Sequence, residues 1–318
     1  MKKNFLKITL VLLTFVAFSC SNDDDSSQQT TNTIADFVSA NPNYSSLKAA
    51  LDRAGLTSTL DGTTNYTVFA PDNAAFSAFL TSNGFASLND VPVDVLQQVL
   101  LNHVVTGTNL STSLTTGYVK TLATEATTSN PIDMYINTSS GVMINGDVSV
   151  TAADIMVDNG VIHAVNKVIA LPTVVTFAIA DSTFDTLVAA LTADAGFTYV
   201  STLSSMSSPA PFTVFAPTNG AFGDLLTELG VGGLGDIPTA TLEATLNTHV
   251  VAGANVLSTA LTDNMTVTTL GDTFTINLGS GATFTDQNGR TGNIIVTDVQ
   301  AANGVVHVID KVILPNLN

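Results

Sequence analysis

The sequence predicts an α+β protein built from two tandem copies of one domain. A ten-residue stretch occurs as Thr67–Phe76 (TVFAPDNAAF) and again as Thr213–Phe222 (TVFAPTNGAF), with eight identical positions and an offset of 213 − 67 = 146 residues. Solenoid repeats have periods of about 20–50 residues, so this offset indicates a duplicated domain. In each copy, helix-like periodicity comes first and short strand-like runs follow, which is typical of the α+β class.

The repeated stretch itself predicts a strand, a tight corner and a helix. Thr-Val-Phe follows Tyr66 in the first copy and Phe212 in the second, and such a β-branched and aromatic run suits a buried strand. Asp72 or Thr218 then stands where a side-chain oxygen can cap a helix N-terminus. The stretch holds no nucleophile, base or metal ligand at a catalytic spacing, so we interpret it as architectural.

Further helices are expected on both sides of this stretch. The spacing predicts helices over Thr33–Ser39 and Ser45–Ala54, and a helix after a Ser182 cap in the second copy. A later helix in each copy leads into Asn102-His103 or Thr248-His249. The apolar positions expected to face the core are Phe184, Leu187, Val188 and Leu191, then Phe76, Phe79, Phe222 and Leu225, and finally Val95, Leu96, Val99, Leu100, Leu242 and Leu246.

The second half of each copy predicts a mostly antiparallel sheet. Short Thr- and Val-rich runs alternate there with Gly, Asn and Asp. Asn159-Gly160 and Asn303-Gly304 stand between apolar runs, which is the strongest short hairpin signal. The linker over Thr173–Phe177 is short and apolar, so the two domains are expected to contact one another. The remaining expected strands are Tyr118–Leu122, Ile132–Asn137, Val142–Ile144, Val148–Val150, Met265–Thr269, Thr273–Leu278 and Ala282–Thr285.

A second repeated signature makes a family resemblance visible. It spans Asp154–Ile169 in the first copy and Asp298–Ile313 in the second, and both contain Asn-Gly-Val and a histidine. Together with the Thr-Val-Phe-Ala-Pro stretch it resembles a tandem of fasciclin-like domains. The resemblance implies a β-sandwich or wedge with packed helices in each copy. We expect fasciclin-like domains at residues 33–172 and 173–318, after a signal peptide at 1–19 and a disordered acidic tether at 20–32.

The first nineteen residues have the features of a lipoprotein signal peptide. Lys2, Lys3 and Lys7 precede the apolar run Ile8–Phe18. Eleven apolar residues suit a signal-peptide core and fall short of the roughly 20 that span a membrane. Cys20, the sole cysteine, resembles the acylated first residue of a mature bacterial lipoprotein. Two or three acyl chains there would anchor the protein to the membrane. The alternative is an ordinary secretory signal followed by an incidental cysteine.

The acidic tether and the net charge indicate where the protein is located and which classes of partner it can bind. Asp23–Asp25 is either a solvated tether or an export tag like that of surface-exposed lipoproteins, and we expect an outer-membrane lipoprotein of a bacterial cell envelope. All 26 acidic residues follow residue 19 while three of the nine basic ones precede it, so the mature chain is 26 − 6 = 20 charges negative. This charge balance argues against a nucleic-acid partner, because binding nucleic acid needs clustered Lys and Arg.

Enzyme, metal and cofactor signatures are absent from the sequence. It has no Gly-x-Ser-x-Gly elbow, phosphate loop or dinucleotide fingerprint, so we expect a protein that is not an enzyme and needs no cofactor. Its four histidines lie at matched places, two per copy, without the clustering of a metal site. We interpret them as hydrogen-bonded core or edge residues. They are His103, His163, His249 and His307.

An aspartate that recurs in both copies gives the candidate binding site. Asp154 and Asp298 can be interpreted as strand-end residues that bind local backbone N–H groups. The resemblance implies another role, because animal members use an Asp-Ile pair and an earlier Tyr-His pair for integrin adhesion. Asp154-Ile155 matches the first pair, whereas at the earlier place both copies keep the histidine and lack the tyrosine. The candidate ligand-binding residues are therefore Asp154, Ile155, His103, Asp298 and His249.

These features predict a non-enzymatic, lipid-anchored adhesion or binding protein. Its partners would be envelope or extracellular-matrix proteins or polysaccharide, and two domains would supply avidity. The alternative is a lipoprotein that captures a glycan or small ligand for an outer-membrane uptake system. A glycan site usually uses exposed aromatic rings, and the chain has no Trp and only five Tyr, which counts against the alternative.

Overall fold

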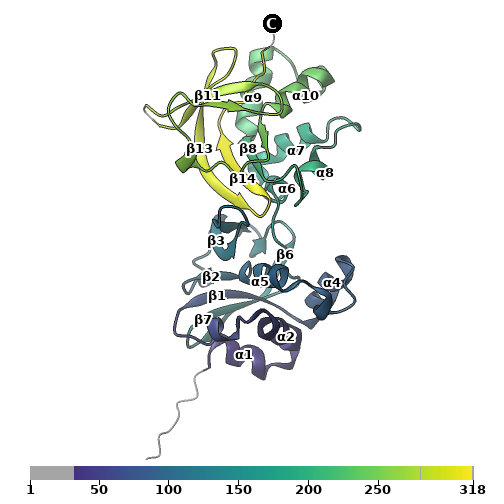
Figure 1. Cartoon of the computed structure of the whole chain (residues 1–318), viewed down its shortest axis with the longest axis vertical. Helices are drawn as coiled ribbons and strands as arrows, with labels where there is room; N and C mark the ends of the chain where they lie inside the picture. Colours follow the sequence, from purple (N-terminus) through teal and green to yellow (C-terminus); the bar gives the residue numbers. More distant parts are fainter. Residues whose placement is uncertain (1–31, 280, 317–318) are drawn as a thin grey trace, which may run out of the picture. The chain divides into compact units, whose positions relative to one another are not determined.

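The computed structural model describes residues 32–279 and 281–316 (Figure 1). The predicted signal peptide, Cys20 and Asp23–Asp25 lie outside the described residues. Both repeats fall within one compact unit, Asn32–Asn318. Among the described residues, no single helix is long and apolar enough to cross a membrane. One consecutive pair, Val174–Ala180 and Ser182–Leu191, reaches that length and composition only jointly, across a bend of 94°.

The first repeat places its helices before and between the first strands of its sheet. The helices are α1 (Ile34–Ala40), α2 (Ser45–Ala54), α3 (Thr57–Leu60), α4 (Asn73–Ser82) and α5 (Val93–Leu101), with 3-10 turns η1 (Pro42–Tyr44) and η2 (Leu88–Asp90). The strands are β1 (Tyr66–Pro71), β2 (Val104–Thr106), β3 (Gly117–Thr124), β4 (Pro131–Asn137), β5 (Met143–Ile144), β6 (Val148–Val157) and β7 (Gly160–Val165).

The second repeat follows the same order. Its helices are α6 (Val174–Ala180), α7 (Asp185–Leu191), α8 (Tyr199–Leu203), α9 (Asn219–Leu229) and α10 (Thr239–Asn247), with 3-10 turns η3 (Ser182–Phe184), η4 (Leu234–Asp236) and η5 (Ser258–Ala260). Its strands are β8 (Phe212–Pro217), β9 (Val250–Ala252), β10 (Thr266–Thr268), β11 (Thr273–Asn277), β12 (Thr283–Thr285), β13 (Thr291–Ala301) and β14 (Gly304–Ile309).

Each repeat is therefore a barrel-like sheet with packed helices. In the first, β1 to β7 form a closed barrel in sequence order, and in the second the strand order is β10-β11-β12-β13-β14-β8-β9. The strands are antiparallel except that β1 pairs in parallel with β7, and β8 with β14. The α+β prediction is confirmed, and the sandwich or wedge implied by the resemblance takes the form of a barrel-like sheet.

Successive side chains of β1 point to two different parts of the core of the first repeat. Val68 belongs to the cluster under the helices, whereas its neighbour Phe69 belongs to the cluster inside the barrel with Met134 and Ile144. Successive side chains of a strand point to opposite faces, so one short apolar run serves both layers. This is why the Thr-Val-Phe stretch is apolar at consecutive positions.

Most predicted helix signals are confirmed, with two corrections. Asp72 accepts the Ala75 N–H at 2.8 Å, as expected for an N-cap. In the second repeat Ser182 does not cap the helix. Asp181 caps the 3-10 turn η3 that leads into α7, since its carboxylate accepts the Thr183 N–H at 3.0 Å. Val95 was expected in the core, but it is 40% exposed because it lies on the outer side of α5.

Both Asn-Gly pairs lie at the predicted hairpins, and the glycine has a specific steric role there. Gly160 already pairs with Val157 as the first residue of β7. A Cβ atom at Gly160 would lie 1.9 Å from the Tyr66 carbonyl oxygen, and one at Gly304 would lie 2.2 Å from that of Phe212. Only glycine therefore allows β7 to lie against β1, and β14 against β8.

The asparagine of each pair fastens the helices to the sheet. Asn159 accepts the Ile34 N–H at 2.9 Å and donates to the carbonyls of Leu60 and Gly62 at 2.8 and 2.7 Å. Asn303 makes the equivalent bonds to Val174, Leu203 and Ser205 at 2.9, 2.8 and 2.9 Å. Three backbone groups from two helical segments are thus satisfied by one buried amide.

We predict that Gly160→Ala destabilises the chain by about 3 kcal/mol or more, because the new methyl group meets backbone that cannot move without breaking the β1–β7 pairing. Gly55→Ala is the matched control, since Gly55 also has a positive φ but has no heavy atom within 4 Å of its Cβ position. It should cost only about 1–2 kcal/mol. Urea unfolding of the two variants tests this, and equal losses would contradict the steric explanation.

Candidate functional site

Asp154 lies in an irregular part of β6. The register between β6 and β7 shifts on either side of Ala152, and Asp154 has a φ of 61°. Few residues other than glycine adopt this left-handed conformation, which is typical of bulges that redirect a side chain. The Asp154 N–H donates to His163 Nδ1 at 3.2 Å. The bulge thus turns the Asp154 carboxylate toward the loop after β2.

That carboxylate is held by one serine. Asp154 Oδ1 accepts the Ser111 N–H at 2.7 Å, and Oδ2 accepts the Ser111 hydroxyl at 2.6 Å. These bonds lower the pKa of Asp154. The residue is exposed, so a fixed negative charge lies at the surface. The interpretation of Asp154 as a strand-end residue with local partners was wrong, because it lies within the strand and its partner is 43 residues away.

The second repeat builds the same arrangement around Asp298. Its φ is also 61°, its N–H donates to His307 Nδ1 at 3.4 Å, and its carboxylate accepts the N–H of Ser258 at 2.7 Å and also the hydroxyl of that serine. Sequence reasoning missed both serines. The two aspartates are 144 residues apart in the sequence, whereas the two serines are 147 residues apart. The segments that join serine to aspartate therefore differ in length between the repeats, and this difference hides the correspondence of the serines.

The candidate residues His103 and His249 lie in the core and do not accompany the aspartates. His103 Nδ1 donates to the Val99 carbonyl at 2.7 Å, while Nε2 accepts the Ile169 N–H at 2.8 Å. His249 bonds the Thr245 carbonyl and the Ile313 N–H in the same way. Both side chains are buried and both ring nitrogens are occupied. The expected binding role is therefore corrected for these two residues, since neither presents a surface to a partner.

Both repeats also match one known family. The fasciclin domain family model matches residues 42–172 and 182–315. The chain belongs to the fasciclin domain family. Such domains generally serve adhesion or binding. Among the described residues of the two fasciclin domains, no group of three or more His, Cys, Asp or Glu side chains could hold a metal ion.

Several curated proteins are similar to this chain in sequence. The transforming growth factor-beta-induced protein ig-h3 of Oryctolagus cuniculus is 30% identical over 266 residues, 81% of this chain, and that of Sus scrofa is 30% identical over 268. This chain spans only 36% of the length of either relative. The uncharacterized protein sll1735 of Synechocystis is 35% identical over 148 residues, 45% of this chain and 98% of its own length.

Among solved structures, the chain is similar to one of a domain pair. It is a FAS1 domain pair from the insect cell adhesion molecule Fasciclin I, with 18% sequence identity and a TM-score of 0.45. The alignment covers 85% of this chain and 92% of that one.

The recurring aspartate lies on β6 in the first fasciclin domain and on β13 in the second, and we call this strand the aspartate strand. The two domains differ in how far the residues that follow the aspartate are exposed to solvent. Beside Asp154, Ile155 is half-buried and Met156 is 56% exposed. Beside Asp298, the equivalent Val299 and Gln300 are only 3% and 0% exposed. The same strand is therefore open in the first domain and covered in the second.

The cover in the second domain comes from the β3–β4 hairpin of the first. Asp133 Oδ2 accepts the Gln300 N–H at 2.6 Å, and Lys120 donates to the Asp298 carbonyl at 3.0 Å. Lys120 also pairs with Asp133 at 2.6 Å. Burial raises the pKa of Asp133, although the ammonium of Lys120 opposes that shift. The predicted contact between the two domains thus includes a partly buried ion pair.

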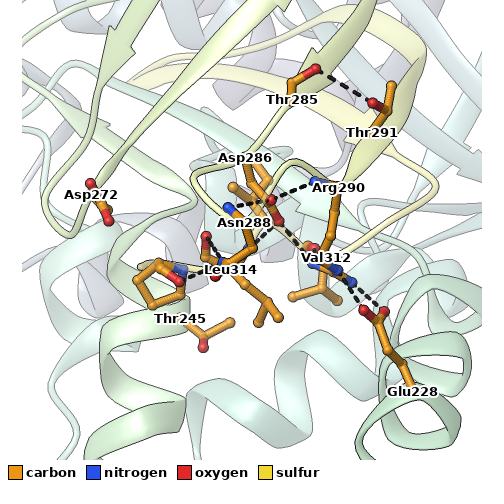
Figure 2. A network of polar contacts seen from close by, with 12 residues as sticks. Glu228, Thr245, Asp272, Thr285, Asp286, Asn288, Arg290, Thr291, Val312 and Leu314 are labelled. Carbon is orange, nitrogen blue, oxygen red and sulfur yellow. Dashed lines mark hydrogen bonds and ion pairs between the residues drawn. The ribbon is translucent and has the colours of Figure 1, made fainter. Parts of the chain in front are cut away.

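A second polar cluster, shown in Figure 2, is structural. Asp286 Oδ2 accepts both the Arg290 guanidinium at 2.9 Å and the Leu314 N–H at 3.2 Å. Arg290 also binds both Glu228 oxygens and the Val312 carbonyl. Every charged group of this cluster has a partner within the second domain. We therefore interpret it as a clamp that holds the end of the chain to the β12–β13 loop.

The two core histidines make stability depend on pH. Burial lowers the pKa of His103 and of His249 to about 4, against about 6.5 when unfolded. Between these values the unfolded chain binds more protons, so stability is complete above pH 6.5 and falls as the pH drops toward 4. Each histidine should contribute roughly 3 kcal/mol to this loss.

We predict that His249→Gln makes the unfolding free energy of the second domain less dependent on pH by roughly 2 kcal/mol between pH 7 and 4.5. Urea unfolding at both pH values measures the difference. His103→Gln is the matched variant in the first domain and should have the same effect there. If both variants kept the full pH dependence of the unmodified chain, buried neutral histidines would not be its cause.

Proposed function

We propose that this protein is a non-enzymatic adhesion protein whose contact surface is the open β6 face of its first fasciclin domain. We define the β6 face by Ala152, Ala153, Asp154 and Met156, all of which are exposed. The partner would be an envelope or extracellular-matrix protein, and polysaccharide is the other class of partner. The general role of fasciclin domains in adhesion or binding supports this proposal.

The observation that carries the proposal is the different use of one strand in the two domains. The β13 strand of the second domain receives a β-hairpin, with bonds to Lys120 and Asp133. The equivalent β6 strand of the first domain has the same bulge and the same fixed aspartate, but it is uncovered. A face that accepts protein in one repeat is well suited to accept protein in the other.

The chemistry of the β6 face fits a protein partner. Met156 stands where the covered strand has Gln300, so the open face is the more apolar of the two. Methionine adapts its shape and is common at binding surfaces. Asp154 adds a carboxylate that is held in place before binding, so little conformational entropy is lost when a cationic or N–H donor meets it.

We further propose that acyl chains on Cys20 anchor the protein to the outer membrane and that Asp23–Asp25 directs it to the cell surface. The apolar run before Cys20 and the acidic run after it support this part of the proposal. Anchoring many copies on one surface would add avidity to modest single contacts.

We predict that Met156→Gln lowers binding of the soluble mature chain to its matrix or envelope protein by about tenfold, as expected when an exposed apolar anchor is lost. A screen of immobilised matrix proteins finds the partner, and surface plasmon resonance compares the variants. Ile295→Gln is the matched control, because Ile295 is 51% exposed on β13 outside the covered strand segment. Equal loss in both variants, or none in Met156→Gln, would contradict the assignment of the β6 face.

We predict that Cys20→Ser releases the protein from the membrane fraction into the soluble fraction, since the thioether that carries the lipid cannot form. Radioactive palmitate supplied to the cells should be incorporated into the protein that carries Cys20 and not into the Cys20→Ser variant. Replacing Asp23–Asp25 with alanine should keep the label and reduce protease access on whole cells. A Cys20→Ser protein that remained in the membrane fraction would contradict lipid anchoring.

A further inference from the structure

We infer that a cleft in the second fasciclin domain binds a single neutral sugar ring. The cleft lies between α8, α10 and the turn at Leu270, and has a volume of about 200 Å³. Its walls include Phe197, Tyr199, Glu243 and Asn247. This inference rests on the binding role proposed above, but it concerns a different site in a different domain.

The cleft contains polar groups that the protein itself leaves unused. The Tyr199 hydroxyl lies 3.0 Å from Asn247 Oδ1 and 3.1 Å from the Glu243 carbonyl oxygen, which fixes the ring and the amide. The Glu243 carboxylate and Asn247 Nδ2 form no hydrogen bond with any described residue. An acceptor and a donor therefore remain available within one small cleft. Paired hydroxyl groups of a sugar are suited to such a combination.

An exposed apolar wall is held rigidly beside these polar groups. Leu270 is 54% exposed, yet its N–H donates to the Val250 carbonyl at 2.8 Å. The next N–H, of Gly271, donates to the Asn247 carbonyl at 3.1 Å. A Cβ at Gly271 would lie 2.6 Å from Thr248 Oγ1, so the turn packs closely on α10. The backbone that carries Leu270 is thus fixed before any ligand arrives.

The first fasciclin domain has no such set of side chains at the equivalent positions. Asn303 and Asn159 bind the carbonyls of Leu203 and Leu60, so α8 corresponds to α3 and Tyr199 to Leu56. His249 follows α10 as His103 follows α5, so these two helices correspond to one another. Asn247 then corresponds to Leu101, and Glu243 to Gln97.

This comparison separates the cleft from the requirements of the fold. Leu56 is buried, and Leu101 packs against the core of the first domain. The scaffold therefore folds with leucine at both places. Tyr199 and Asn247 are therefore not required by the fold, and they give the second domain a polar cleft wall that the first domain lacks.

The shape and charge of the cleft select the class of ligand. Phe197 and Leu270 offer apolar surface to the C–H face of a pyranose ring, while Glu243 and Asn247 meet its hydroxyl groups. A volume of about 200 Å³ is below the roughly 300–1,000 Å³ of sites for drug-sized ligands, which favours one ring. The Glu243 carboxylate and the negative mature chain disfavour acidic sugars.

The test uses the mature chain with Cys20→Ser on an array of neutral, amino and uronic-acid oligosaccharides, followed by calorimetric titration with the best neutral glycan. We expect binding to neutral glycans, lowered at least tenfold by Asn247→Leu, which installs the residue of the first domain. Glu243→Ala should also lower it, and this variant leaves the fold intact because the carboxylate has no protein partner. Gln97→Ala, the matched change in the first domain, should have no effect.

The inference would be overturned if no neutral glycan binds, if uronic acids bind best, or if binding persists in both Asn247→Leu and Glu243→Ala. The Met156→Gln variant separates this inference from adhesion through the β6 face. If the Met156→Gln variant still binds the sugar, this result supports the cleft, whether or not the variant still binds its protein partner. Sugar binding abolished by Met156→Gln alone would place the glycan on the β6 face and contradict the cleft.

Discussion

The architecture of each domain depends on one close approach, that of its last strand to its first. β7 runs parallel to β1, and β14 to β8, so the end of each domain returns to the strand that opened its sheet. A glycine permits the contact, because Gly160 and Gly304 have no Cβ to meet the neighbouring carbonyl. The asparagine before each glycine then binds the helical segments. Sheet closure and helix packing are thus joined at one dipeptide, since a buried amide must satisfy all its polar atoms.

The residues that recur in both domains build the scaffold. The histidines satisfy backbone groups in the core or behind the bulge, and the aspartates fasten the loop after β2 or β9 through a serine. In the second domain, Figure 1 shows helices α7, α8 and α10 to the right of strands β13 and β14. A motif that identifies a family can therefore consist mainly of structural residues, because a strand crossing and a bulge tolerate few alternatives.

The two domains differ in the residues that fill the interior of the sheet and in those that lie at the surface. Inside the barrel, Phe274 and Phe284 of the second domain stand where the first has Met134 and Ile144. On the aspartate strand, Gln300 is covered by the neighbouring domain while Met156 is open. Such differences are free to evolve because the closure at the Asn-Gly pair does not depend on them. One scaffold can then present a protein-binding face in one copy and a cleft in the other.

The sequence by itself determined the duplication, the α+β class, most helix and strand positions and the two Asn-Gly hairpins, because these follow from local periodicity and turn chemistry. It also located Asp154 and Asp298. Only the tertiary structure decided which candidates reach the surface: His103 and His249 face inward, Ser111 and Ser258 join the aspartates across loops of unequal length, and packing of the first domain on the second covers one aspartate strand. Burial and contacts between distant segments depend on how layers pack, and a single sequence carries no direct record of that packing.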